Sequence, residues 1–163
     1  MSMVEDTPPK LELRVATFPE DAAVAEQLLR EYFTWLELPT THRGFEDEMK
    51  ALSVHYSGDA GVLLLLKQGQ NTIGCVALQR HDATTAEVRR LYVQDLYSGR
   101  GHGELLMKEV IKMAATLRYQ RLVLGAIPKT VKAQALYRKL GFGPAEAFYP
   151  LPRLGTAFYS IWL

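Results

Sequence analysis

Apolar and polar residues alternate along 11–16, which predicts a first β-strand. Proline and two acidic residues at 19–21 suit the first turn of a helix. The apolar positions after them recur three and four residues apart, as on one face of a helix: Ala25, Leu28, Leu29, Tyr32, Phe33 and Leu36. Pro39 ends this helix, and a weaker helical pattern covers 45–52.

The rest of the chain continues with short strands and two more helices. The apolar run 61–66 predicts a buried strand over 62–67, and a turn at 69–71 leads to a partner strand at 72–79. A helix beginning after residue 101 has one apolar face: Leu106, Val110, Met113, Ala114 and Leu117. The other predicted elements are strands at 87–93, 121–127, 146–149 and 156–163, and a helix at 131–140 closed by Gly141.

Composition limits the classes of protein that this pattern can build. The 163 residues suit a single α+β domain over 11–163, preceded by a flexible N-terminus at 1–10. Lys plus Arg total 19 and Asp plus Glu total 18, a balance that argues against a nucleic-acid or membrane-surface binder. Cys75 is the single cysteine, which excludes an internal disulfide and favours the cytoplasm, and we expect no signal peptide or bilayer-spanning segment.

The most informative segment is 90–107, where a strand leads into a glycine-rich turn and then a helix. Gly99, Gly101 and Gly103 let the backbone approach an anion closely, and the free amides at a helix start favour phosphate. The nucleotide P-loop requires Gly-Lys-Ser/Thr, which is absent, and the dinucleotide fingerprint requires a third glycine where Glu104 stands. A nucleotide-binding protein is therefore a distant alternative.

This loop resembles the acyl-CoA pyrophosphate loop of the GCN5-related N-acetyltransferases, whose pattern is Arg/Gln-x-x-Gly-x-Gly/Ala. Its three fixed positions fall on Ser98, Gly101 and Gly103, and Ser98 departs from the usual Arg or Gln. The segment 135–142, Ala-Leu-Tyr-Arg-Lys-Leu-Gly-Phe, resembles the family's penultimate helix. The predicted order βααβββαβαββ is also similar to the family's, which implies a mixed central sheet of about seven strands flanked by helices.

The resemblance implies a site for acetyl-CoA and direct transfer of its acetyl group to an amine. In such proteins the fourth strand separates from the fifth, and its backbone binds the pantetheine and the thioester carbonyl. Here that stretch is Leu91, Tyr92 and Val93. The residues implied for the pyrophosphate are Ser98, Gly99, Arg100, Gly101, His102, Gly103 and Glu104, with Arg100 a candidate for the donor missing at 98.

Two residues are candidates for proton transfer. Glu87 is the candidate base, and two-residue alternation places it on one face with Arg89, Leu91 and Val93 unless a bulge intervenes. A surface glutamate paired with a neighbouring arginine is the alternative. Tyr137 matches the family tyrosine that protonates the leaving thiolate, and packing within its helix is the alternative.

The acceptor is the least defined part of the prediction. By the resemblance, its site lies opposite CoA, and the candidate residues are Tyr32, Trp35, Arg43, Tyr149 and Arg153. An arginine could bind a carboxylate, whereas the acidic run 46–48 could attract a polyamine. A small amine is the leading acceptor, and a peptide or protein acceptor, a non-catalytic acyl-CoA sensor and a homodimer remain open. The scattered histidines show no metal-binding spacing, and we expect no metal.

Overall fold

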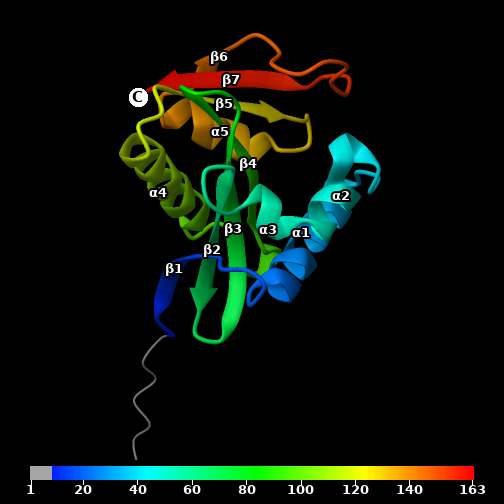
Figure 1. The fold of residues 1–163 in the computed structure, drawn as a ribbon, viewed down its shortest axis with the longest axis vertical. Helices are drawn as coiled ribbons and strands as arrows, with labels where there is room; N and C mark the ends of the chain where they lie inside the picture. Colours follow the sequence, from blue (N-terminus) through cyan, green and yellow to red (C-terminus); the bar gives the residue numbers. More distant parts are fainter. Residues whose placement is uncertain (1–8) are drawn as a thin grey trace, which may run out of the picture.

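A twisted seven-stranded sheet forms the centre of the computed structural model, which describes residues 9–163 (Figure 1). The strands are β1 (Leu11–Val15), β2 (Gly61–Gln68), β3 (Asn71–Arg80), β4 (Thr85–Val93), β5 (Arg121–Ala126), β6 (Gly143–Pro144) and β7 (Ala157–Trp162). Their spatial order is β1-β2-β3-β4-β5-β7-β6. The β4–β5 pair is parallel and the other pairs are antiparallel.

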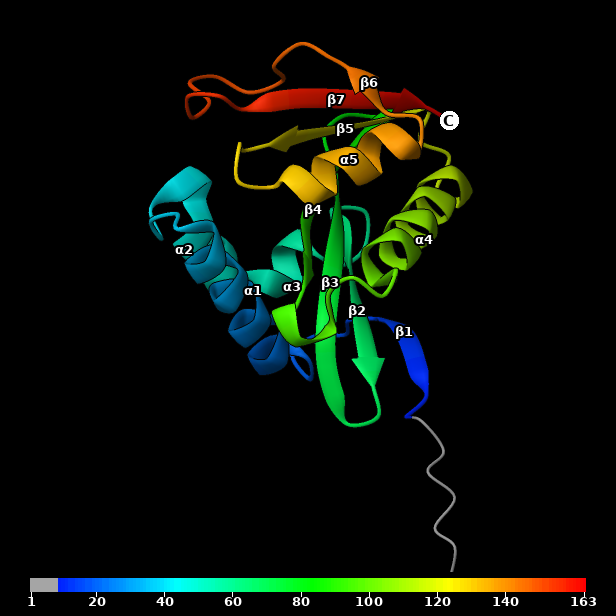
Figure 2. The same cartoon turned by 180° about the vertical axis from the view of Figure 1, so that it is seen from behind.

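Helices cover both faces of the sheet, as Figures 1 and 2 show from opposite sides. The α-helices are α1 (Ala22–Leu36), α2 (Phe45–Lys50), α3 (Leu52–His55), α4 (His102–Thr116) and α5 (Val131–Lys139), and two 3-10 turns are η1 (His42–Gly44) and η2 (Asp95–Tyr97). The first three helices lie on one face, and α4 and α5 lie on the other. The sheet is therefore buried on both sides at its centre.

Two hydrophobic cores result from this arrangement, one on each face. In β2, Leu64 and Leu66 join the core under α4, while Leu63 and Leu65 join the core under α1. Successive side chains of a strand point to opposite faces, so a strand covered on both faces needs apolar residues at every position. This explains the continuous apolar run in the sequence of β2.

A β-bulge interrupts β4 in its middle. Arg89 pairs with Ala77 and Tyr92 pairs with Cys75, so two residues of β4 stand opposite one of β3. Arg90 sits in the bulge with φ of 60°. The bulge reverses the alternation: Val88 and Leu91 lie on the α4 face, whereas Glu87 and Tyr92 lie on the α1 face. The predicted exception therefore applies: the bulge leaves Arg89 on the face of Glu87 and moves Leu91 and Val93 to the opposite face.

The two parallel strands at the centre of the sheet separate after a short ladder. Only Thr85–Glu87 of β4 pairs with Arg121–Val123 of β5, and β5 continues along β7 to its end. Beyond Glu87, the edge of β4 that faces β5 has no strand partner in the ladder. Backbone groups of β4 are thus available to a molecule that enters between the two strands.

The predicted α+β class and the order of elements are confirmed. The helix predicted at 45–52 is broken at Ala51, whose φ of −133° is not helical. The strand predicted at 146–149 is wrong, because β6 ends at Pro144 and the rings of Phe148 and Tyr149 pack edge-on against Phe158 instead. Most of the predicted flexible N-terminus, 1–8, lies outside the described residues, and within 9–163 no helix is long and apolar enough to cross a membrane.

Candidate active site

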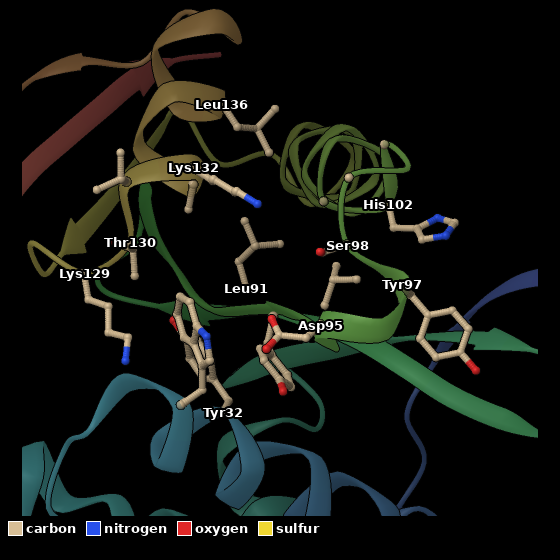
Figure 3. Close-up of a pocket in the computed structure, with 18 residues that line it drawn as sticks. Tyr32, Leu91, Asp95, Tyr97, Ser98, His102, Lys129, Thr130, Lys132 and Leu136 are labelled. Atoms are coloured by element: carbon tan, nitrogen blue, oxygen red, sulfur yellow. The ribbon is translucent and has the colours of Figure 1, made fainter.

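A cavity of about 520 Å³ opens where β4 separates from β5. Its walls come from the end of β4, the loop before α4, the start of α5 and one side of α1 (Figure 3). Figure 3 shows Leu91 and Lys132 pointing into its centre, with Ser98 on the α4 side and Tyr32 at its floor. A long, partly anionic ligand would contact both apolar strand residues and the loop.

The start of α4 forms one end of this cavity. Gly101 occupies the N-cap position with φ of 81°, and Gly99 has φ of 74°, values that favour glycine. Within the described part of the chain, 9–163, no side chain caps the first turn of α4, so its leading amides have no side-chain partner there. Unpartnered amides and the helix dipole suit a phosphate, which fits the prediction for this loop.

Most of the residues predicted to bind the cofactor line this cavity: Leu91, Tyr92, Val93, Ser98, Gly99, Gly101, His102 and Gly103. Arg100 and Glu104 do not. The Arg100 guanidinium lies 6.0 Å from the Tyr97 ring centre, and Glu104 forms ion pairs with Lys108 at 3.3 Å and Lys139 at 3.1 Å. The expectation that Arg100 replaces the missing donor at 98 therefore has no support from its position.

Sequence reasoning missed the contribution of the β5–α5 connection to the cavity. Lys129, Thr130 and Lys132 line it, and so do Ala133 and Leu136 on α5. Lys129 also lies 5.1 Å from the ring centre of Trp35 and 3.8 Å from a Glu37 oxygen. The sequence did carry one signal. The fourth and fifth strands were expected to separate, and residues that directly follow the fifth strand should lie at the edge of the space between them.

A second, smaller cavity of about 70 Å³ lies on the β5 side of β4. Glu87, Arg43, Tyr137 and Tyr149 line it, together with His42, Arg89 and Arg90. Tyr32 and Thr130 line both cavities. The two cavities are therefore neighbours that share these two residues in their lining.

Glu87 lies in a charged corner of the smaller cavity. Its residue is 7% exposed, and its Oε2 atom lies 3.4 Å from Arg43 Nη1 and 3.9 Å from Arg89 Nε. The alternative to a role as base was a pair with a neighbouring arginine, and the 3.9 Å contact with Arg89 is such a pair, although a long one. Glu87 also lines the cavity, so its contact with Arg89 does not remove it from the site.

Tyr137 is buried in the core and also lines the smaller cavity. Its ring centre lies 5.9 Å from Phe142 and 6.1 Å from Tyr159. Burial, with the neighbouring Tyr32 and Tyr159 hydroxyls, raises the pKa of Tyr137 well above its usual value. The phenol therefore keeps its proton at neutral pH, and the same shift makes it a weaker acid than a thiol.

The residues predicted for the acceptor are only partly brought together. Tyr32, Arg43 and Tyr149 line the smaller cavity, and the Arg43 guanidinium lies 3.6 Å above the Tyr149 ring centre. Trp35 lines the larger cavity instead, because it lies one turn along α1 from Tyr32, with their rings stacked at 6.4 Å. Arg153 is exposed and lines neither of the two cavities.

The acidic run 46–48 does not form a polyamine site. Glu46 binds Arg30 with two hydrogen bonds, of 2.8 and 3.0 Å, away from both cavities. Glu48 is buried, and it accepts hydrogen bonds from Arg89, Arg90 and Tyr56, with the shortest to Arg90 at 2.6 Å. Burial alone would raise the pKa of Glu48, but the two guanidinium groups outweigh it and lower the pKa to about 2.

A family model described as "Acetyltransferase (GNAT) family" matches residues 23–142, which include the glycine loop, the lining of the larger cavity and all of the lining of the smaller cavity except Tyr149. The chain belongs to this family of acetyltransferases. A protein of Schizosaccharomyces pombe called an uncharacterized N-acetyltransferase is 28% identical over 90% of this chain and 93% of its own length. The N-acetylaspartate synthetases of Danio rerio and Homo sapiens are 40% and 34% identical, over 46% and 50% of this chain. This chain matches only 27% and 28% of their lengths.

Solved structures share the fold. An acetyltransferase of Streptococcus agalactiae has a TM-score of 0.78 at 19% identity, covering 94% of this chain and 98% of that one. An acetyltransferase of the GNAT family from Staphylococcus aureus has a TM-score of 0.80 at 19% identity, with 94% and 99% covered. A GNAT family acetyltransferase from Elizabethkingia anophelis with acetyl-CoA bound has a TM-score of 0.60 at 22% identity, with 94% and 98% covered.

Proposed function

We propose that this acetyltransferase moves the acetyl group of acetyl-CoA directly to the amino group of a small molecule. The observation that carries the proposal is a pair of neighbouring cavities that share Tyr32 and Thr130 in their lining. The larger one has the size, the apolar wall and the helix N-terminus suited to a pantetheine with its pyrophosphate. The smaller one has a carboxylate and a phenol suited to proton transfer.

In this reaction, bound acetyl-CoA supplies the reactive thioester, and residues of this chain move the protons. Glu87 accepts a proton from the acceptor ammonium, which leaves a neutral amine to form the new C–N bond. A backbone N–H of 91–93 donates to the thioester oxygen as negative charge develops there, an interaction worth roughly 3 kcal/mol in comparable sites. As the C–S bond breaks, Tyr137 donates its proton to the thiolate, and the proton that the new amide nitrogen loses returns through water to the Tyr137 phenolate. The products are then a neutral amide, the CoA thiol and the proton held by Glu87.

The dimensions of the smaller cavity favour a small acceptor over a peptide. Its volume of about 70 Å³ accommodates an amine with a few attached atoms. The relatives named N-acetylaspartate synthetase are named for a small acetylated product, which supports the same class of acceptor. Because the match spans only part of those relatives, it does not carry the identity of the acceptor to this chain.

Two measurements test the proposal. Acetyl-CoA at ~100 times its Kd should stabilise the fold by ~2.7 kcal/mol through mass action, seen as a higher melting temperature, whereas NAD and ATP should have much less effect. Mixtures of acetyl-CoA and small amines should release the CoA thiol and yield acetylated amine by mass spectrometry.

Each outcome separates one alternative from the proposal. Stabilisation by acetyl-CoA without turnover of any amine would support the acyl-CoA sensor. Efficient acetylation of peptides but not of free amines would support the peptide acetyltransferase. The absence of any stabilisation by CoA thioesters would contradict the use of the larger cavity altogether.

A further inference from the structure

The charges around the smaller cavity are unequal. Arg43, Arg89 and Arg90 line it, and Arg153 lies close enough to His42 to affect its pKa. The carboxylates in this region are Glu87 at the cavity and Glu48 behind it. Burial, with the charges of these arginines, lowers the pKa of His42 to about 4, so His42 is neutral at pH 7. The three guanidinium groups that line the cavity and the two carboxylates leave a net charge of +1 there.

Two of these arginines are occupied by the protein itself. Arg90 donates to Glu48 from Nη2 at 2.6 Å and from Nε at 3.2 Å, and its guanidinium lies 4.8 Å from the Phe33 ring centre. Arg89 donates to Gln79 and to Glu48. Both arginine side chains are less than one tenth exposed. They fix the shape of the cavity and have little capacity for a ligand.

Arg43 differs from both in its freedom to bind a ligand. Its side chain is 30% exposed, and its one side-chain hydrogen bond within residues 9–163 goes to Glu87 at 3.4 Å. A guanidinium carries five N–H donors, so most of its capacity remains available. Its plane is held 3.6 Å above the Tyr149 ring centre, which orients it without using those donors.

We infer that the acceptor carries a carboxylate beside its amino group, as an amino acid does, and that Arg43 binds this carboxylate while Glu87 receives the ammonium. This inference deepens the proposed function and rests on it. Arg43 and Glu87 are partners in the free protein, and a molecule with a carboxylate and an ammonium on neighbouring atoms offers each of them a new partner. The exchange conserves the ion pairs in a partly buried site, where an unpaired charge is costly.

The same arrangement makes the carboxylate important for turnover as well as for binding. While Arg43 contacts Glu87, the guanidinium competes with the substrate ammonium for that carboxylate. A substrate carboxylate takes the guanidinium away and leaves Glu87 to accept the proton. Polyamines and peptide lysines have no carboxylate next to the reacting amine, and they also bring positive charge to a positive cavity.

The test compares free amino acids with their C-terminal amides in the CoA-release assay. An amide keeps the side chain but loses the negative charge, and its amino group is more often neutral, so the amide should react faster if the amine alone mattered. We expect kcat/KM for the acids to exceed that for the amides by ~10–100-fold, the range expected of a charged hydrogen bond.

The decisive variant is Arg43→Gln, which should reduce this ratio toward one, mainly by lowering kcat/KM for the acids. Arg30→Gln is the control, because Arg30 also forms ion pairs, with Glu26 and Glu46, and faces an aromatic ring, Phe45, but lines neither cavity. Arg43→Lys keeps the charge and should retain part of the preference. In the presence of CoA, an amino acid should raise the melting temperature of the wild type but not that of Arg43→Gln.

The outcomes distinguish this inference from the proposed function. Equal turnover of acids and amides by the wild type would overturn the inference while leaving the acetyltransfer to small amines intact. An acid preference that survives in Arg43→Gln, with normal acetyl-CoA stabilisation of that variant, would overturn the role of Arg43. Failure of every amine to release CoA would contradict the proposed function itself.

Discussion

At the scale of single residues, Glu48 is the buried carboxylate that holds Arg89 and Arg90 in place beside the smaller cavity. It is 2% exposed and compensates two arginines that are themselves nearly buried. We expect Glu48→Gln to lower the free energy of unfolding by roughly 3 kcal/mol, because it leaves two guanidinium groups without their carboxylate. Urea denaturation measures the change.

Glu46→Gln is the matched control for this prediction. Glu46 stands two residues away, pairs with Arg30, and both side chains are 40% exposed, so solvent screens the interaction. Its loss should change the urea midpoint much less than the loss of Glu48. Equal effects of the two substitutions would mean that the buried network contributes no more than a surface ion pair.

Tyr137 is the residue for which packing and catalysis make different kinetic predictions. If it protonates the thiolate, Tyr137→Phe should lower kcat by ~10²-fold or more and leave the KM for acetyl-CoA nearly unchanged. The phenyl ring preserves the contacts with Phe142 and Tyr159. Steady-state kinetics at saturating acceptor provide the measurement.

Tyr159→Phe controls for the removal of a nearby hydroxyl. The Tyr159 hydroxyl bonds to Gln134 and accepts from Arg138, within the same core, but Tyr159 does not line the acceptor cavity. We expect this variant to keep its kcat. An unchanged kcat in Tyr137→Phe as well would return Tyr137 to a purely structural role.

At the scale of elements, α5 supplies a positive charge to the larger cavity, where the glycine loop supplies none. Ser98 has a single short hydroxyl where related loops carry a long donor, and Lys132 in the first turn of α5 extends into the same cavity (Figure 3). We expect Lys132→Gln to weaken binding of CoA by ~3–10-fold, since the gain from a charged hydrogen bond is partly screened at a cavity mouth. Titration calorimetry measures the Kd.

The control for Lys132 is Lys112→Gln on the exposed side of α4, which should leave the Kd unchanged. Repeating the titrations with dephospho-CoA shows whether Lys132 acts on the pyrophosphate or on the 3′-phosphate. If Lys132→Gln binds CoA as tightly as the wild type, the amides of α4 hold the phosphates without help from α5.

The elements also show where prediction from sequence fails. The order of elements along the chain was predictable, because β2 is a continuous apolar run and α4 repeats its apolar positions at helical spacing. The bulge at Arg90 had no such signal, since one inserted residue leaves the composition of β4 unchanged. Yet the bulge decides that Glu87 and Leu91 lie on opposite faces of β4.

At the scale of the whole molecule, the candidate site combines short motifs with long-range contacts. The glycine loop and the 135–142 motif were predictable because each is local in sequence. The partnership of Arg43 with Glu87, and of Glu48 with Arg89 and Arg90, joins residues 41 to 44 positions apart. The periodicity of apolar residues does not predict such pairs. The charge around the smaller cavity therefore follows only from the three-dimensional arrangement of the sheet and the first three helices.

The pH dependence of stability should show this assembled charge pattern in two separate windows. His42 has a pKa of about 4 in the folded protein against an ordinary 6.5, so the unfolded chain binds its proton first. Its contribution to stability is therefore present above pH 6.5 and lost as the pH falls toward 4. Glu48 has a pKa of about 2 against an ordinary 4.5, so its contribution is lost between pH 4.5 and 2.

Variants of the two residues should remove one window each. We expect His42→Gln to flatten the decline of the free energy of unfolding between pH 6.5 and 4 and to leave the lower window unchanged. Glu48→Gln, although less stable throughout, should flatten the decline below pH 4.5, because glutamine has no proton to gain. Urea denaturation at fixed ionic strength across both ranges measures these slopes.

If both variants keep the wild-type slopes, the arginines around the smaller cavity do not act on His42 and Glu48 as their positions imply. The positive potential on which selection of a carboxylate-bearing acceptor depends would then be absent.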